Sequence, residues 1–386
     1  MSKLKTNTIQ HTGGSADNIT LDNSQNVTAE GNLTVDGNLT VSGTSTISGY
    51  NPTSSRNNRN LIINGACNVA QRGTSSTSSN YATVDRFKLN TTGTDEAPTQ
   101  AQVDVGSSDL PFTKGLTKAY KITNGNQTSG AGSGDRIVIQ HRLEAQDIRN
   151  SGWNYTSTSS YVTLSFYVKS SVAQNFFGKV KTSDGTSQNY PFETGSLSAD
   201  TWTKITKTIS GNSNLQFDHN NGQGLEIEFT IFRGTDETGS VTLNQWAAFS
   251  GSTHTPDNTS TWYTTNDATL EITGVQLEVG SVATDFEHKS YGDELARCQR
   301  YYERNTCTWA GYTAASQGNG SLRVYYNTTK RAAATLSVVT AATSVQNLTS
   351  QNLGDAKVDG FVVDTRIGSS GYGRFYDLLA ASDAEL

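Results

Sequence analysis

The chain has 386 residues, which at ~100–200 residues per domain predicts two or three domains. Hydrophobic residues make up 33% of it and charged residues 17%, alongside 16 Tyr, 13 Phe and 5 Trp. Low charge with abundant Thr and aromatic residues is typical of β-structure with polar turns, and disfavours disordered chains, helical bundles and doubly wound α/β folds. The formal net charge of −6, without a Lys- or Arg-rich stretch, disfavours nucleic-acid binding.

Neither a targeting segment nor a cofactor motif is recognisable in the sequence. No run approaches the ~18 apolar residues of a membrane span, and residues 1–10 lack an apolar signal core, so we expect neither membrane insertion nor export by such a signal. The three cysteines form no CxxC pair and are predicted to be reduced structural thiols. The five histidines lack the spacing of metal ligands and the familiar nucleotide-binding and hydrolase motifs are missing, so no metal site and no cofactor are expected.

Residues 1–25 contain short β-prone segments in which apolar and polar residues alternate. Such a segment gains order by pairing with the edge of a partner's sheet or by lying in its groove. We therefore expect an attachment segment. The residues assigned to attachment are Leu4, Thr6, Ile9, Ile19 and Leu21.

A hexad repeat occupies residues 26–50, with Gly-Asn-Leu-Thr-Val occurring twice in succession between degenerate copies. Apolar residues two apart share one face of a short strand. One chain offers too few hexads to enclose a core, so three chains around a common axis are predicted, forming a homotrimeric β-shaft. A flexible linker is the alternative, which the regular alternation disfavours. The residues predicted to face the threefold axis are Leu33, Val35, Leu39, Val41 and Ile47.

Three further regions follow a polar linker at residues 51–59. Residues 60–289 show recurring short strands separated by polar turns, which predicts a β-sandwich, jelly-roll-like body. Residues 290–304 predict one helix, because Ser290 and Asp293 form a capping-box-like start before an apolar periodicity. Residues 305–386 return to a β pattern and predict a small C-terminal domain. The fold class is thus all-β and elongated. The strands expected in the body are Leu61–Ile63, Val84–Leu89, Ala119–Thr123, Arg136–Leu143, Tyr161–Val168, Phe176–Lys181, Trp202–Ile209, Leu225–Phe232 and Leu270–Leu277.

Aromatic residues in polar surroundings are the candidate ligand contacts, because sugar rings stack their C–H faces on aromatic rings. The alternative is that each ring covers an edge of the core. The candidates are Trp246, Trp262, Tyr263, Trp309, Tyr312, Tyr372 and Tyr376. Glycan-cleaving enzymes instead need paired carboxylates, for which Glu226 and Glu228 on one strand face, followed by Asp236 and Glu237, are candidates. The simpler interpretation of these four is a solvated outer face, so no catalytic residue is assigned.

Four segments carry a family resemblance: the run from Asn60 to Thr74, Asp85-Arg86-Phe87, the run from Ile272 to Glu287, and the helix-forming run from Ser290 to Glu303. The first three resemble the body domain of bacteriophage tail fibres, and the last resembles the helix that follows it in those proteins. The N-terminal Lys3–Ile9 segment and the closing Ala384-Glu385-Leu386 are similar to fibres of marine, particularly cyanobacterial, phages. The resemblance implies a virion protein whose sandwich is similar to carbohydrate-binding modules and whose distal end recognises the host surface.

The resulting hypothesis is a trimeric tail fibre of the virion. Its N-terminus would attach to other tail proteins, and its distal domains would bind host surface glycan without catalysis, nucleic acid or membrane insertion. Two alternatives stay open at this stage. One is a tailspike-like glycan hydrolase, which a convergent carboxylate pair in a groove would support. The other is a purely structural virion fibre or adaptor, which a further virion protein bound to the C-terminal domain would support.

Overall fold

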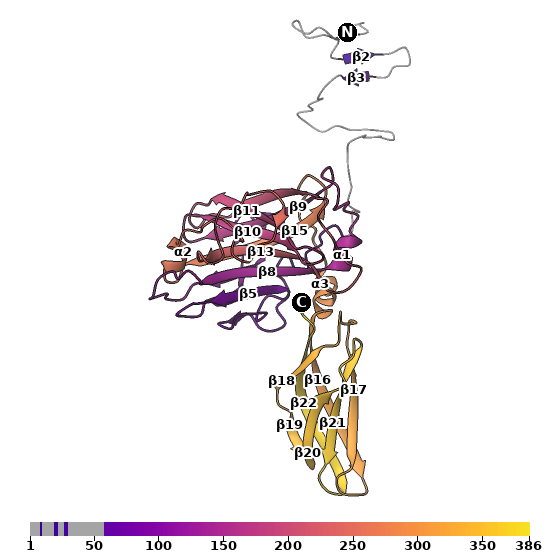
Figure 1. Cartoon of the computed structure of the whole chain (residues 1–386). Coiled ribbons are helices and arrows are strands. Elements are labelled where there is room, and N and C mark those ends of the chain that lie inside the picture. Colours follow the sequence, from indigo (N-terminus) through magenta and orange to yellow (C-terminus); the bar gives the residue numbers. More distant parts are fainter. Residues whose placement is uncertain (1–7, 10–18, 22–26, 30–57) are drawn as a thin grey trace. The chain divides into compact units, whose positions relative to one another are not determined.

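The computed structural model describes Thr8–Ile9, Ile19–Leu21, Val27–Ala29 and residues 58–386. The chain divides into two compact units, Met1–Tyr50 and Asn51–Leu386. In the first unit, β1 (Thr8–Ile9), β2 (Ile19–Leu21) and β3 (Val27–Ala29) form a three-stranded antiparallel sheet (Figure 1). Ile9, Ile19 and Leu21 thus lie in strands, whereas Leu4, Thr6 and the five predicted axis residues from Leu33 to Ile47 lie outside the described residues.

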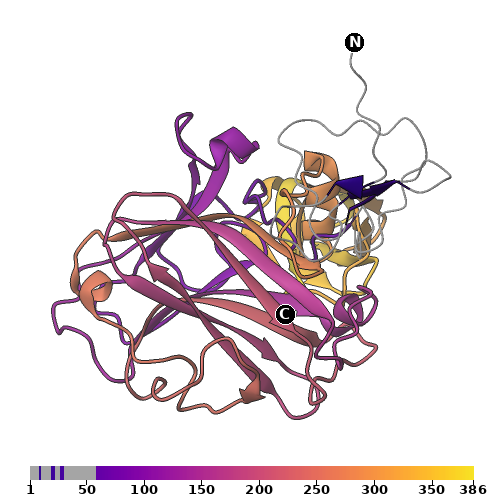
Figure 2. The ribbon, with the colours of Figure 1, turned by 90° about the horizontal axis from the view of Figure 1, so that it is seen from above.

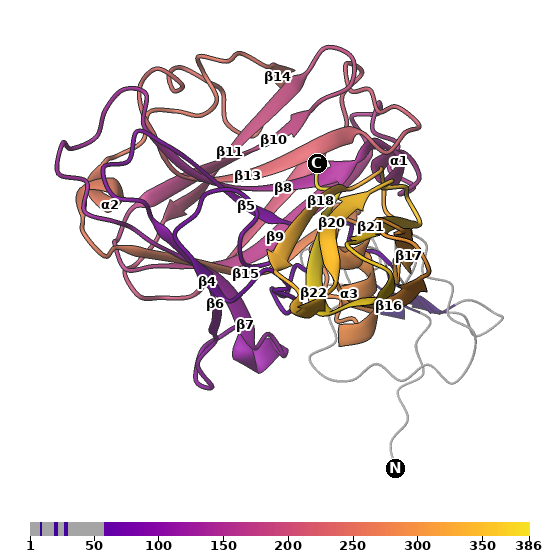
Figure 3. The same cartoon turned by 90° about the horizontal axis from the view of Figure 1, so that it is seen from below.

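Two six-stranded antiparallel sheets form the sandwich body, defined here as strands β4 to β15. Figure 3 shows them as two layers. Sheet I has the order β14 (Ala247–Ala248), β11 (Gln188–Ser196), β10 (Asn175–Thr182), β13 (Gln223–Arg233), β8 (Arg136–Glu144) and β5 (Phe87–Thr92). Sheet II has the order β12 (Thr203–Ser210), β9 (Tyr161–Ser170), β15 (Thr269–Val279), β7 (Lys118–Thr123), β6 (Thr99–Asp104) and β4 (Ser75–Ser76).

The main core lies between these two sheets, because alternate residues of each strand point inward. In β13 the alternate apolar residues Leu225, Ile227, Phe229 and Ile231 are buried. The Phe229 ring meets Phe166 of sheet II edge-on, with 4.8 Å between ring centroids. The sheets therefore interlock through large apolar side chains, and the prediction of an all-β sandwich is confirmed.

The positions of most body strands agree with the predictions. Leu61–Ile63 is the exception, because it forms no strand although Ile62 is fully buried in the core. Four strands were not predicted, namely β4, β6, β11 and β14. In β6 and β11 polar residues interrupt the apolar alternation, so the local pattern is weak.

Short helices lie at the ends of the body strands. α1 (Ala145–Arg149) and α2 (Thr261–Thr264) occupy opposite ends (Figures 1 and 2), and η1 (Phe112–Lys114) is a single 3₁₀ turn. The helix predicted over residues 290–304 is α3 (Tyr291–Gln299), and it is shorter than predicted because Tyr302 already begins the next strand. Its cap is confirmed, since Ser290 Oγ accepts a hydrogen bond from the Asp293 amide at 3.2 Å and donates one to Asp293 Oδ2 at 2.6 Å.

The C-terminal sheets, defined as β16 to β22, pack as a four-stranded sheet against a three-stranded one. The first contains β16 (Tyr302–Thr313), β22 (Gly371–Asp383) and β18 (Thr335–Thr340), with β19 (Thr343–Gln346) also paired to β22. The second contains β17 (Asn319–Tyr325), β21 (Gly360–Ile367) and β20 (Leu348–Gly354). A separate small core around Phe361, Val363 and Phe375 holds them together.

Ion pairs tie the last residues of the chain to the body. Glu385 contacts the guanidinium groups of Arg72 and Arg86, and both arginine side chains are buried. Arg72 also pairs with Asp383 at 3.1 Å. The ends of β16 and β22 that carry Tyr302 and Asp383 are therefore the ends in contact with the body.

Two further predictions concern reactivity and membrane association. Cys67, Cys298 and Cys307 are free and buried, as predicted for structural thiols, and burial raises the pKa of the Cys67 thiol to about 12. In the part of the chain that the structure describes, no helix combines the length and apolar character needed to cross a membrane.

Candidate functional site

The C-terminal sheets bring two of the predicted aromatic residues together. Tyr312 of β16 and Tyr372 of β22 are direct cross-strand partners, and their side chains are 63% and 72% exposed. Their rings meet edge-on with 5.2 Å between centroids. We call these two residues the tyrosine pair. Together they offer exposed ring surface with hydroxyl groups at its rim, which suits an amphipathic ligand.

Two other candidates in the C-terminal sheets are half-buried. Trp309 points inward, and a Cβ added to Gly311 or Gly320 would lie 2.5 Å or 2.2 Å from its ring, so both glycines leave room for the indole. Tyr376 is half-covered and lies beside the guanidinium of Arg374, 5.5 Å from its ring centroid. Of these two rings, Trp309 packs beside Gly311, the residue next to Tyr312.

The prediction is wrong for Trp262 and Tyr263, which are fully buried. Both lie in α2, where they close one end of the sandwich core. Trp262 Nε1 donates to the Thr269 carbonyl at 3.0 Å, and the Tyr263 hydroxyl donates to Asp135 Oδ2 at 2.9 Å. Buried aromatic rings need such partners for their polar atoms, and no ring surface is left for a ligand. Polar neighbours in the sequence concealed this role.

Trp246 is also mostly buried, yet part of it lines a pocket. Its ring packs against Tyr190, and its Nε1 donates to the Ser210 carbonyl at 2.8 Å. The pocket lies between strands β11 and β14 and the segment 240–253. Its other lining residues, including Asn189 and Gln245, were not predicted from the sequence, because they come from two segments that are distant in the chain, 189–191 and 240–253.

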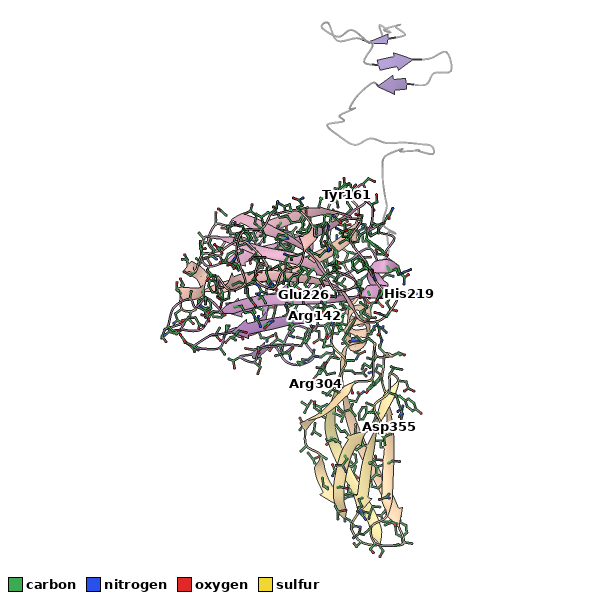
Figure 4. All side chains as sticks on the ribbon, viewed as in Figure 1. Arg142, Tyr161, His219, Glu226, Arg304 and Asp355 are labelled. Atoms are coloured by element: carbon green, nitrogen blue, oxygen red, sulfur yellow. The ribbon has the colours of Figure 1, made fainter. Side chains whose placement is uncertain are left out.

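Glu226 and Glu228, two of the carboxylates considered for glycan cleavage, form ion pairs with neighbouring cationic side chains. Glu226 is bound by Arg142 Nε at 3.0 Å, and Figure 4 shows these two side chains on the neighbouring strands β13 and β8. Glu228 accepts from Arg233 Nη2 at 2.8 Å and lies 3.4 Å from Lys179 Nζ. Burial alone would raise the pKa of Glu228, but Lys179 and Arg233 outweigh it and hold that pKa well below its usual range.

The expectation of a solvated outer face is therefore wrong here. Glu226 and Glu228 are both buried. Around Glu228, the segment after β13 folds back over this face of sheet I. His254 from that segment receives a hydrogen bond from Lys179 Nζ at 2.7 Å, and Glu237 pairs with Arg233 and Arg136. Asp236 stays exposed. A general acid needs a raised pKa and access to the leaving group, and Glu228 has neither.

Comparison with known proteins gives structural similarity only. No protein-family model matches the chain, and no curated protein matches it. Among solved structures, the chain is similar to the enzymatically active domain of bacteriophage CBA120 tailspike protein 4, with 12% identity and a TM-score of 0.29 over 57% of this chain and 22% of that one.

Two isolated binding domains show similarity at the same level. The N-terminal cellulose-binding domain of Cellulomonas fimi β-1,4-glucanase C aligns with 10% identity and a TM-score of 0.26, over 56% of this chain and 99% of that one. The family 11 carbohydrate-binding module of Clostridium thermocellum aligns with 9% identity and a TM-score of 0.24, over 55% and 98% respectively. Similarities of this size carry no argument about ligand or activity.

Proposed function

We propose that this chain is a trimeric, non-catalytic adhesin of a bacteriophage tail, which attaches to the virion through its N-terminal segment and binds host surface glycan through its C-terminal sheets. The hexad repeat and the sequence resemblance to tail fibres motivate the trimer and the virion. The observation that carries the adhesive function is the exposed tyrosine pair.

The position of the pair suits contact with a surface. Tyr302 and Asp383 are cross-strand partners at the body end of β16 and β22, and Tyr312 and Tyr372 are partners ten residues further along β16. At ~3.4 Å per residue, this distance along the strand is about 34 Å. Three copies in a trimer would present three such pairs, and avidity of ~10²–10⁴ would compensate for weak single contacts.

Adhesion is favoured over hydrolysis by the state of the carboxylates. Glu226 and Glu228 are both buried and paired with cationic side chains, so neither is placed to donate a proton to a glycosidic oxygen. Release of reducing ends from host glycan by the pure chain, lost in Glu226→Gln or Glu228→Gln, would overturn this part of the proposal.

The adhesive role is tested with the intact chain on host cells. The double variant Tyr312→Ala/Tyr372→Ala is expected to lower cell binding by about tenfold or more, because it removes the stacking surface from all three copies. Tyr325→Ala is the matched control, since Tyr325 is 69% exposed in the same sheets but lies near the body end of β17. Equal binding of the double variant and the control would contradict the tip assignment.

Point variants are preferable to removal of the whole C-terminal region. Deleting residues 305–386 would also remove Glu385 and leave Arg72 and Arg86 buried without that carboxylate. Unpaired buried charge is strongly destabilising, so a loss of binding would not be informative. Deleting residues 1–25, in contrast, should leave a chain that binds cells and fails to join virions.

The trimer is tested separately by light scattering. The intact chain is expected to have three times the mass of one chain. Leu39→Asp, which would place three carboxylates together on the predicted axis, should abolish the trimer. A monodisperse monomer of the intact chain would contradict both the trimer and the shaft.

A further inference from the structure

A pocket lined by three arginines lies where α1 and α3 approach the same end of the sandwich body (Figure 1). We call it the arginine pocket. Its volume of about 540 Å³ is within the ~300–1,000 Å³ range of ligand sites. The arginines come from two segments that are distant in the chain, because Arg59 precedes the first strand of the body, whereas Arg297 lies in α3 and Arg300 directly follows it.

All three arginine side chains can be reached from the solvent. Those of Arg59, Arg297 and Arg300 are 20%, 28% and 31% exposed. Each arginine is paired with a glutamate that is less exposed than the arginine itself. The partners are Glu278, Glu294 and Glu144, in that order, and their side chains are 1%, 12% and 0% exposed. A molecule that enters the pocket therefore meets guanidinium groups before it meets their carboxylates.

The existing ion pairs leave hydrogen-bonding capacity on these guanidinium groups. Arg59 Nε lies 3.7 Å from its glutamate and Arg297 Nη1 lies 3.5 Å from its own. Both distances exceed the ~2.7–2.9 Å of a good charge-assisted hydrogen bond, so these two charges are only loosely engaged. Arg300 is held firmly, since its Nε and Nη2 both donate to Glu144 at 2.7 Å. Its Nη1 makes no hydrogen bond to any residue that the structure describes, which leaves that group to donate to a ligand.

The rest of the lining suits a sugar ring with a single negative charge. Asn58, Asp147 and Asn150 are exposed and offer amide and carboxylate groups to hydroxyls, and Leu61 adds a partly exposed apolar side chain. Asp147 is the one acidic side chain among the described residues that line the pocket. Because like charges repel, Asp147 favours a ligand with one negative charge over a ligand with two.

We propose that the arginine pocket binds a pyranose that carries one carboxylate, as uronic acids do. The carboxylate accepts hydrogen bonds from Arg297 and from Nη1 of Arg300, because the planar guanidinium group matches the geometry of a carboxylate. Arg59 adds a third positive charge, and hydroxyls of the ring bind Asp147 and Asn150. The inference rests on the proposed function only for the class of ligand, a glycan, because these residues are separate from the tyrosine pair.

The test uses pairs of sugars that differ in one group. The methyl glycosides of glucuronic and galacturonic acid carry a carboxylate where those of glucose and galactose carry a hydroxymethyl group. The intact chain is titrated with each sugar by calorimetry, and saturation-transfer NMR detects the contact. We expect saturable binding of at least one acidic glycoside, tighter than binding of its neutral counterpart by about tenfold or more. Glucose 6-phosphate, the probe with more negative charge, should bind more weakly than the acidic glycoside.

Three variants of the chain locate the binding. Arg297→Gln should weaken binding of the acidic glycoside by about tenfold or more and leave binding of the neutral one unchanged. This arginine is chosen because its own contacts are long, at 3.4 and 3.5 Å, whereas loss of Arg300 would leave the buried Glu144 without its partner. Asn150→Ala, at an exposed position, should weaken binding of the acidic glycoside through its hydroxyls. Arg149→Gln is the matched control, because Arg149 is an exposed arginine of α1 that does not line the pocket.

The outcomes separate this site from the tip. Absence of saturable binding for both acidic glycosides overturns the inference, as does equal binding of the neutral counterpart or tighter binding of glucose 6-phosphate. Binding that survives Arg297→Gln and Asn150→Ala but disappears in Tyr312→Ala/Tyr372→Ala also overturns it, and leaves the proposed tip function standing. Loss of acidic-glycoside binding in the pocket variants, with cell binding unaffected by the tyrosine variant, supports the pocket and contradicts the tip. Should Arg297→Gln fail to fold, the Asn150 variant still decides the result.

Discussion

Among the aromatic residues considered as ligand contacts, those of the sandwich body are buried, whereas two of those in the C-terminal sheets are exposed. In the body, Trp246 and Trp262 are buried and their indole N–H groups donate to backbone carbonyls. In the C-terminal sheets, Tyr312, Tyr325 and Tyr372 are each more than half exposed. Eleven large hydrophobic side chains are exposed among the described residues, and seven of them belong to the C-terminal region. These seven are the three tyrosines together with Val338, Val339, Val345 and Val358.

The size of the two regions accounts for the difference. Two sheets of six strands enclose a core wide enough to take rings from the strands and from both ends. Sheets of four and three strands enclose a much smaller one, and a small domain buries a smaller fraction of its surface. Outward-facing rings in the C-terminal sheets therefore stay in water. Exposure of an aromatic ring follows from the layer in which it lies, and polar neighbours in the sequence do not reveal it.

The difference in ring burial between the two regions is tested most directly by removing one ring from each. Trp262→Ala should lower the free energy of unfolding of the body by about 3–5 kcal/mol, because it leaves a cavity in the core and removes a bonded indole. Tyr312→Ala, the counterpart in the C-terminal sheets, should change it by less than about 0.5 kcal/mol. Urea denaturation followed by circular dichroism measures both. Equal effects would mean that the two regions do not differ in the way described.

The C-terminal sheets do contain one costly buried interaction. Lys330 and Glu303 are both fully buried, with 2.6 Å between Lys330 Nζ and Glu303 Oε2. Glu303→Gln should cost about 3 kcal/mol, since it leaves the ammonium group without its carboxylate. The double variant Glu303→Gln/Lys330→Met should recover most of that loss, because methionine removes the unpaired ammonium group while glutamine keeps an oxygen that accepts from Asn327. Thermal unfolding of the single and double variants measures both effects. A double variant as unstable as Glu303→Gln would show that the loss does not come from the unpaired Lys330 ammonium group.

Acid should affect the body before the C-terminal sheets, because residues 302–386 contain no histidine. Burial, together with the positive charges of Lys179 and Arg233, lowers the pKa of His254 to about 3. The unfolded chain therefore binds a proton that the folded chain does not, and stability is lost as pH falls from about 6.5 towards 3. At pH 5 we expect a loss of about 1 kcal/mol after allowance for solvent screening.

The contribution of His254 is isolated by comparison with His254→Gln, whose amide can replace both ring hydrogen bonds. The variant should show a flatter fall in unfolding free energy between pH 7 and pH 5. Asp85 acts in the opposite sense, because burial raises its pKa to about 6 and its contribution to stability is lost as pH rises through that value. This contribution of Asp85 is the same in the unmodified chain and in His254→Gln, so it cancels when their pH slopes are compared. Identical pH slopes would exclude His254 as the acid-sensitive group.

Strongly periodic segments could be predicted from the sequence, and contacts between distant segments could not. The alternation from Leu225 to Ile231 predicted a strand where β13 lies, although both faces of that strand are buried, and Ser290 marked the start of α3. The burial of Glu228 depends on Lys179 from another strand and on His254 from a covering segment. The same limit applies to the tyrosine pair, whose members are sixty residues apart and meet only through the register of β16 and β22.

The smallest predicted effect concerns α3, which follows the body and precedes β16. Ser290→Ala removes the side chain that accepts from the Asp293 amide, and loss of such a cap costs about 1 kcal/mol. Two contacts hold α3 and the residue after it to the body: Glu294 accepts from the Asn64 amide at 2.7 Å, and Arg300 pairs with Glu144 at 2.7 Å. Both contacts remain in Ser290→Ala, so the loss should appear in the local unfolding of α3 and not in the unfolding of the body. Hydrogen exchange at the amides of α3 should therefore become faster by about fivefold, while exchange in the core strand β13 stays unchanged.

Ser281→Ala is the control, since Ser281 is exposed and caps no helix. Faster exchange throughout the body in Ser290→Ala would show that α3 and the sandwich body unfold together as one cooperative unit.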